Sequence, residues 1–172
     1  MSINYLVEFA EHAYGRVAGA LDGITEEELR WRPVSEMNTA GKVLRHIARI
    51  SLVLLPRVVE GGTTGNWDDD YEGREHSLAE MLRGVEAGKE RVLGGLRGLE
   101  AEDLEETIPL WGGTHRRVEG VNMLVGELVY HAGQVALIRG ATAGRNQPEK
   151  HNNFTAGPTA RIRCSTPRPL DT

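Results

Sequence analysis

The segment GELVYHAGQVALIRG, residues 126–140, carries a glutamate, a histidine and a glutamine among apolar residues. Glu127 and His131 are four positions apart, which places both side chains on one face of a helix. That face also carries the apolar residues of the segment and its approach, namely Leu124, Leu128, Val135 and Ile138. A carboxylate and an imidazole in an apolar stripe are costly unless they are paired, hydrogen-bonded or bound to a metal.

A second histidine falls on another apolar face. His46 is adjacent to Ile47 and lies three or four residues from Val43 and Ile50, so the helical period points it inward. Two histidines and one carboxylate supply nitrogen and oxygen donors suited to Zn, Ni, Fe or Mn, and three protein ligands leave positions free for water or substrate. The sequence therefore offers His46, Glu127 and His131 as ligands of a divalent transition metal.

Helical spacing by itself leaves a second interpretation of these residues open. Glu127 and His131 form a partly buried ion pair in that interpretation, and His46 is hydrogen-bonded to a carbonyl group. Gln134, one turn beyond His131, either orients a ligand or a metal-bound water or packs at the end of the helix bundle. The residue types allow both.

Four segments have apolar residues at three- and four-residue steps, as amphipathic helices do. The helices that they predict span about residues 2–22, 39–60, 77–98 and 119–140. Pro56 predicts a bend in the second helix. No convincing multi-strand pattern accompanies these helices, so we predict an all-α four-helix bundle, a fold whose sites are built from side chains on facing helices.

The connections between the predicted helices differ in length and composition. Thr25 with Glu28 and Ser77 with Glu80 form capping boxes, which open a short turn and the third helix, respectively. The stretch GGTTGNWDDDYEGREH, residues 61–76, is longer than a tight antiparallel connection needs, which permits a crossover along the bundle. TIPLWGGTHRR, residues 107–117, predicts a small hairpin or an ordered loop.

Composition bounds the domain organisation and the partners. The chain has 172 residues, of which 40% are hydrophobic and 26% charged, and this suits a single folded domain. We expect this domain at residues 1–141, followed by an extended tail at 142–172 with few large apolar residues. The net charge of -5 argues against a nucleic-acid or anionic-membrane partner. The single cysteine, Cys164, excludes an internal disulfide.

We expect a soluble cytoplasmic protein. The N-terminus carries Glu8 and Glu11 where an export signal would have basic residues and then a continuous apolar stretch. The most apolar run, ISLVLL at residues 50–55, is far shorter than the ~20 residues of a membrane-spanning helix.

Two stretches together resemble a known family. LRWRPVSEMNTAGKVLRHIARI, residues 29–50, and ELVYHAGQVALIRG, residues 127–140, are similar to the DinB-like (YfiT-like) metal-binding four-helix bundle superfamily. The first stretch resembles the family pattern of Trp-x-Pro, then Asn-Ser/Thr, then a helix that bears a ligand histidine. The second resembles its His-x-Gly-Gln signature. The resemblance covers residues 1 to about 141 in helix order and loop placement.

The resemblance implies a bundle with up-down-down-up connectivity and a divalent metal held by three residues. By position, the ligand on the second helix is His46 and the last ligand on the fourth helix is His131. Many relatives have His-x-x-x-His on the fourth helix, and Glu127 stands where the first of those histidines would be. This departure makes Glu127 a substitute ligand and leaves the identity of the metal open.

The resemblance also implies a class of chemistry. The superfamily includes transferases and isomerases that use low-molecular-weight thiols such as bacillithiol and mycothiol, beside many members without an assigned activity. We therefore expect a metal-dependent thiol S-transferase, or a related detoxification enzyme, that acts on a thiol and a small electrophile. The alternative is a metal-binding, stress-associated protein without catalytic turnover. Because bundles of this type commonly pair, we also expect a homodimer.

Overall fold

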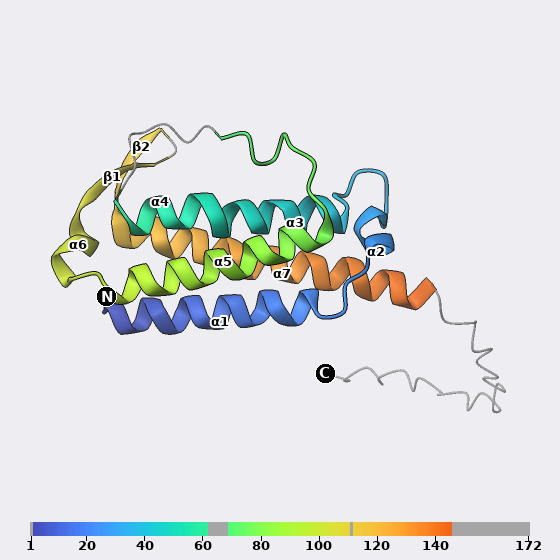
Figure 1. Ribbon diagram of the computed structural model, residues 1–172, viewed down its shortest axis with the longest axis horizontal. Coiled ribbons are helices and arrows are strands. Elements are labelled where there is room, and N and C mark those ends of the chain that lie inside the picture. Colours follow the sequence, from blue (N-terminus) through green and yellow to red (C-terminus); the bar gives the residue numbers. More distant parts are fainter. Residues whose placement is uncertain (1, 62–68, 111, 146–172) are drawn as a thin grey trace, which may run out of the picture.

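Four long helical rods lie side by side along the length of the molecule (Figure 1). The computed structural model describes residues 2–61, 69–110 and 112–145. The rods are α1 (Ile3–Leu21), the continuous series α3, η1 and α4 (Ala40–Arg49, Ile50–Leu54, Leu55–Val59), α5 (Leu78–Arg97) and α7 (Arg117–Arg145). Two short helices, α2 (Glu26–Arg30) and α6 (Ala101–Glu105), lie in the connections. The predicted four-helix bundle is confirmed.

The rods have up-down-down-up connectivity, as the family resemblance implied. In Figure 1, α1 and α7 run in one direction, while α3–α4 and α5 run in the other. The chain therefore has to return along the bundle between the end of α4 and the start of α5. Its described part, residues 69–77, passes over α3, where the Arg49 Nε donates to Asp69 Oδ2 at 2.9 Å. The predicted crossover thus brings loop residues beside α3.

Local sequence signals account for most of the helix starts. The Thr25 and Ser77 capping boxes form as predicted, and the Thr39 hydroxyl accepts a hydrogen bond from the backbone N–H of Lys42. Each cap satisfies a backbone donor that the first helical turn leaves without an intrahelical partner. α6 was not predicted, and it begins at a capping box of Glu100 and Asp103 instead of one built on Ser or Thr.

The second rod contains a π-helical turn, η1, just before Pro56. The backbone N–H of Leu55 donates to the carbonyl of Ile50, five residues earlier. Proline lacks an N–H and its ring collides with the carbonyl four residues earlier in a regular α-helix. A π-helical turn before Pro56 is consistent with these two effects of proline. The bend was predicted at Pro56 itself, whereas the irregular turn lies just before it. Ser51 of η1 is fully buried against Gly88 of α5.

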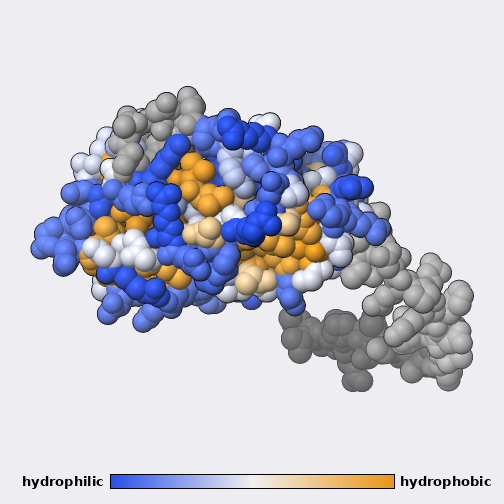
Figure 2. Space-filling model, in the orientation of Figure 1, coloured by the Kyte–Doolittle hydropathy of each residue, from blue (hydrophilic) through white to orange (hydrophobic). Residues whose placement is uncertain are grey.

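The core fills the space between the rods and is closed at one end by a small hairpin. β1 (Thr107–Leu110) pairs antiparallel with β2 (Gly113–Arg116), which confirms the predicted hairpin. Ile108 and Leu110 are buried and approach α7 at Gly120. On the face drawn in Figure 2, hydrophilic side chains predominate and apolar patches lie between them.

The last helix is longer than the sequence pattern indicated. α7 ends at Arg145, whereas its predicted end was residue 140, so residues 142–145 of the predicted tail are helical. Nothing in ATAGR, residues 141–145, breaks a helix as a proline would. The stretch Arg117–Ala141 of α7 is long and apolar enough to cross a membrane by length and composition. In this structure α7 packs against α1 and α3. The rest of the predicted tail, with Cys164, lies outside the described residues.

Candidate metal centre

The structure brings the three predicted ligands together. Each of His46, Glu127 and His131 offers one ligand atom, and these atoms all lie within 4.8 Å of one another. His46 comes from α3, and the other two come from the facing part of α7. The imidazole rings of His46 and His131 meet edge to face, with centroids 4.7 Å apart. Donors from two helices therefore converge in the groove between α3 and α7.

The three side chains are buried to different degrees. The side chain of His131 is 13% exposed, that of His46 is 33% exposed, and that of Glu127 is 50% exposed. Glu127 thus lies at the rim of the apolar stripe of α7 rather than within it. The cluster is anchored in the core by His131 and opens to solvent on the side of Glu127, where a further ligand has access.

The hydrogen bond on the far side of the His131 ring fixes its tautomer. Nδ1 lies 2.8 Å from the Oε1 of Gln134, and the Nε2 of Gln134 donates to the Tyr130 hydroxyl at 2.9 Å. Because an amide oxygen only accepts hydrogen bonds, Nδ1 carries the proton and Nε2 keeps its lone pair. Gln134 therefore orients a candidate ligand, which is the first of its two predicted roles.

The Nε2 atom of His131 distinguishes the two interpretations of the cluster. It is buried and has no hydrogen-bond partner among the described residues, although it lies 3.1 Å from Oε2 of Glu127. The two atoms are close enough for an ion pair, but they make no hydrogen bond, because a hydrogen bond also requires a suitable angle. The lone pair of Nε2 and the carboxylate oxygen of Glu127 repel each other at this distance unless a cation lies between them. The donor set therefore fits a metal ion.

His46 is oriented in the same way by a residue that sequence reasoning missed. Its Nδ1 lies 2.5 Å from Oε1 of Glu72, in the crossover loop. A carboxylate accepts, so Nδ1 donates and Nε2 is left to coordinate; carboxylate–histidine pairs of this kind are typical of metal sites. Partial burial opposes ionisation of Glu72, but the hydrogen bond from His46 and the charge of Arg49 outweigh it and lower the pKa of this carboxyl.

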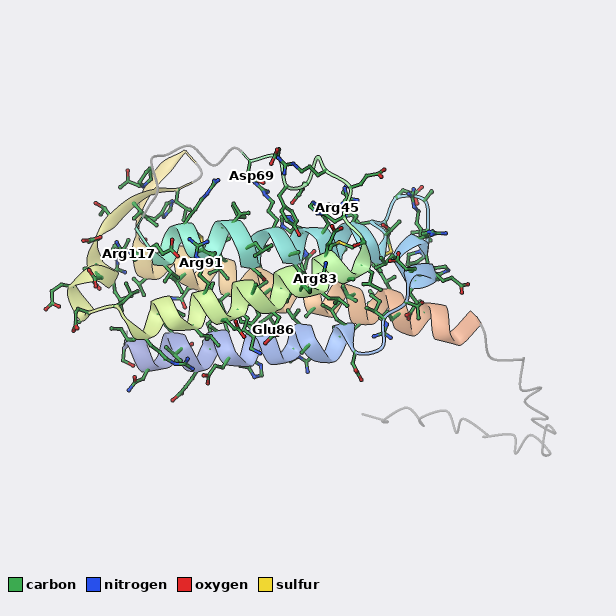
Figure 3. All side chains as sticks on the ribbon, in the orientation of Figure 1. Arg45, Asp69, Arg83, Glu86, Arg91 and Arg117 are labelled. Carbon is green, nitrogen blue, oxygen red and sulfur yellow. The ribbon has the colours of Figure 1, made fainter. Side chains whose placement is uncertain are left out.

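Two arginines of α3 hold the crossover loop in place. Arg49 Nη1 lies 3.4 Å from Oε1 of Glu72, and the Nε of the same arginine pairs with Asp69. Arg45 Nη1 donates to the backbone carbonyl of Glu72 at 3.0 Å. Figure 3 shows Arg45 and Asp69 on the side of the bundle where the loop crosses α3. Glu72 is therefore held by an arginine at its carboxylate and by another at its backbone carbonyl.

Two cavities flank the cluster along the groove. One, of about 400 Å³, is lined by His46, Arg49, Ile50, Leu54, Met123, Leu124 and Glu127. The other, of about 570 Å³, lies toward the C-terminal end of α7 and includes Tyr130, Gln134 and Leu137 in its lining. The candidate ligands themselves line only the first of these two cavities, so that cavity gives direct access to the cluster.

A family model described as the DinB superfamily matches residues 10–135 of the chain. This protein belongs to the DinB superfamily. The match covers all of the candidate ligands and their orienting residues, and it confirms the resemblance seen in the two sequence stretches.

Solved structures support the same fold. A conserved protein from Enterococcus faecalis superposes with a TM-score of 0.64 at 15% identity, over 84% of this chain and 98% of that one. The DinB-like protein YjoA from Bacillus subtilis superposes with a TM-score of 0.63 at 14% identity, over 84% of this chain and 94% of that one. No curated protein matches the sequence. At these identities the likeness concerns the fold alone.

Proposed function

We propose that this protein binds one divalent transition metal, Zn, Ni, Fe or Mn, through His46, Glu127 and His131. The observation that carries the proposal is the buried Nε2 of His131, which has no hydrogen-bond partner among the described residues and faces a carboxylate oxygen. Glu72 and Gln134 hold both imidazoles in the tautomer that leaves Nε2 free to coordinate. Three protein ligands would leave coordination positions for a substrate.

We further propose that the bound metal serves thiol S-transfer to a small electrophile. A divalent metal, when bound, favours ionisation of a coordinating thiol and so supplies a nucleophile at neutral pH. The thiol loses its S–H proton, a sulfur–carbon bond forms, and the bond from that carbon to its leaving group breaks, with the electron pair departing on the leaving group. Glu127, at the exposed rim, is placed to take the thiol proton when it is not itself a ligand.

The metal stoichiometry tests the first part of the proposal. Untagged protein purified without chelator is analysed by elemental mass spectrometry beside His46→Ala/His131→Ala. A matched control, His12→Ala/His115→Ala, removes two histidines outside the cluster. We expect about one ion per chain in the wild type and the control, and almost none in the cluster variant. If the wild type contains no metal even after reconstitution, the proposal fails, and Glu127 and His131 form a structural pair instead.

Turnover separates the proposed enzyme from its alternative. A metal-binding, stress-associated protein without catalysis would have the same ligands and the same stoichiometry. Steady-state assays of the metal-loaded protein with a panel of thiols and electrophiles distinguish the two, with His46→Ala/His131→Ala as the metal-free control. Metal-dependent product formation supports the S-transferase, whereas metal binding without turnover with any pair supports the alternative.

A homodimer is a further part of the proposal and rests on the family resemblance alone. Multi-angle light scattering measures it directly. A mass near twice that of the 18.9 kDa chain would support the dimer, and a mass near that of one chain would reject it.

A further inference from the structure

The cavity of about 400 Å³ shares its wall with the candidate metal centre. His46 and Glu127 line it, and the remaining wall comes from Arg49 at the end of α3, from η1 and from the first half of α7. A molecule in this cavity would therefore lie in contact with two of the three candidate ligands. The volume is well above the roughly 150 Å³ that suffices for a benzene-sized guest, so one substituted ring or a short branched chain would fit.

Apolar side chains form the inner wall of this cavity. Ile50, Leu54 and Leu124 line it and are 1%, 5% and 1% exposed, so they belong to the packed core. Met123, which is 39% exposed, stands at its edge toward solvent. The π-helical turn begins with Ile50 and ends with Leu54, so this irregular turn supplies one side of the cavity. Such turns occur frequently at functional sites.

Away from the metal centre, the described side chains that line the cavity disfavour an anionic group on a guest. Arg49 is the cationic residue among the described residues that line it, and its guanidinium is already engaged by Asp69 and Glu72. Glu127 adds a negative charge to the lining. A carboxylate or phosphate placed against the apolar wall would lose its hydration without gaining a partner, which is costly.

We infer that this cavity binds the uncharged, apolar body of the electrophile and directs its reacting carbon to the metal centre. The inference rests on the proposed function, because it assigns the substrate class of that same site. Met123 is then a specificity-determining residue at the entrance. The second cavity carries Glu36, Asn38 and Gln134 in its lining and contains none of the three candidate ligands, so it is not assigned this role.

Two thiols that differ by one charge test the inference in the protein loaded with Co²⁺. In benzyl mercaptan the sulfur is to bind the metal, and the ring stands in for the apolar body of the electrophile in the cavity. 4-(Mercaptomethyl)benzoic acid adds a carboxylate to the same ring. Binding is followed by the sulfur-to-cobalt charge-transfer absorption. We expect benzyl mercaptan to bind at least about ten-fold more tightly, equivalent to about 1.4 kcal/mol.

A matched pair of variants locates the preference. Met123→Lys puts a positive charge at the cavity entrance, where it can pair with the carboxylate of the charged thiol, and is expected to remove most of the preference for the uncharged thiol. Met37→Lys is the control, because Met37 is the same residue type, is 37% exposed and lines the second cavity instead. Both methionines are partly exposed, so both variants should fold, and thermal melting curves check this.

The outcomes distinguish the inference from the proposed function. Cobalt binding with equal affinities for the two thiols, or a Met123→Lys variant that keeps the preference, would overturn the inference and leave the metal site standing. If no metal binds, the proposed function fails, and the cavity is then probed with benzyl alcohol in the metal-free protein. Shifts of the Ile50, Leu54 and Leu124 methyl resonances would support an apolar guest site there, and unchanged methyl resonances would refute it.

Discussion

Glu72 and His46 are 26 positions apart in sequence, yet the Glu72 carboxylate lies 2.5 Å from Nδ1 of the His46 imidazole. The contact forms because the connection between α4 and α5 returns along the bundle and is tied to α3 by Arg45 and Arg49. A carboxylate at Nδ1 fixes the ring orientation and raises the basicity of Nε2, the nitrogen that faces the candidate metal centre.

Removal of the Glu72 carboxylate should weaken metal binding without removing a ligand. For Glu72→Ala we expect a loss of roughly 10- to 100-fold in Zn²⁺ affinity, because the His46 ring loses its orienting acceptor. Competition with a chromophoric chelator measures the affinity. Glu75→Ala, which removes an exposed carboxylate from the same loop, is the control and should bind Zn²⁺ like the wild type. Equal affinities for Glu72→Ala and the wild type would exclude a role for Glu72 in the site.

Replacement of Glu127 tests whether this residue is a ligand. Glu127→Ala should bind Zn²⁺ more weakly than the wild type, because one of three donors is lost. Glu127→His should still bind about one ion per chain, because an imidazole at this position restores a donor four residues from His131. Elemental mass spectrometry and chelator competition measure both variants. An alanine variant with wild-type affinity would show that the metal is held without Glu127.

The close approach of α5 to the π-helical turn requires glycine at position 88. A Cβ atom built on Gly88 would collide with the backbone oxygen of Ser51, and backbone cannot move aside as a flexible side chain can. We expect Gly88→Ala to lower the free energy of unfolding by about 1–3 kcal/mol, as overpacking of a core does. Urea denaturation measures this change.

Gly94 in the same helix provides the control for that prediction. A Cβ atom at Gly94 meets nothing within 4 Å. Gly94→Ala should therefore raise the free energy of unfolding by about 0.5–1 kcal/mol, because alanine favours helix over glycine. If Gly88→Ala lowers the free energy of unfolding and Gly94→Ala raises it, the need for glycine lies where α5 meets η1. Similar effects of the two substitutions would argue against a special requirement for glycine at position 88.

Arg139 connects α7 to the α1–α2 region and should make stability depend on acidic pH. Its Nε donates to Glu28 at 2.8 Å, and its Nη1 donates to the carbonyls of Ala20 and Asp22, each at 2.8 Å. The hydrogen bond from Arg139 is the main cause that lowers the pKa of Glu28 below its ordinary value of 4.5. Because the pKa of Glu28 is lowered in the folded state, the contribution of ionised Glu28 to the free energy of unfolding is complete above pH 4.5. This contribution is lost as the pH falls through the lowered pKa.

Arg139→Met removes these contacts and keeps an unbranched side chain. We expect a loss of about 1–2 kcal/mol near neutral pH, which is modest for bonds to a charged group because both partners are partly exposed. The difference from the wild type should shrink as the pH falls below 4.5, since protonation of Glu28 removes its charge in both proteins. Denaturation of both proteins at pH values above and below 4.5 measures this difference in the free energy of unfolding. Arg30→Met on α2 is the control, and a pH-independent difference for Arg139→Met would contradict the linkage.

The local pattern of the chain was enough to predict the helices, their capping boxes and the inward direction of His46 and His131. These features depend on residues three or four positions apart, and the helical period relates such residues without knowledge of the rest of the fold. The same pattern placed Glu127 beside His131, and the match of residues 10–135 to the DinB superfamily confirms the family that these stretches suggested.

Glu72 and the π-helical turn emerged only from the folded molecule. Glu72 lies in a polar loop whose sequence carries no period, and it meets His46 only because the up-down-down-up connectivity sends that loop across α3. The wide turn at Ile50–Leu54 likewise depends on Gly88 of another helix, which admits the Ser51 backbone at close range. Such contacts join segments far apart in the chain, so spacing within one segment cannot specify them.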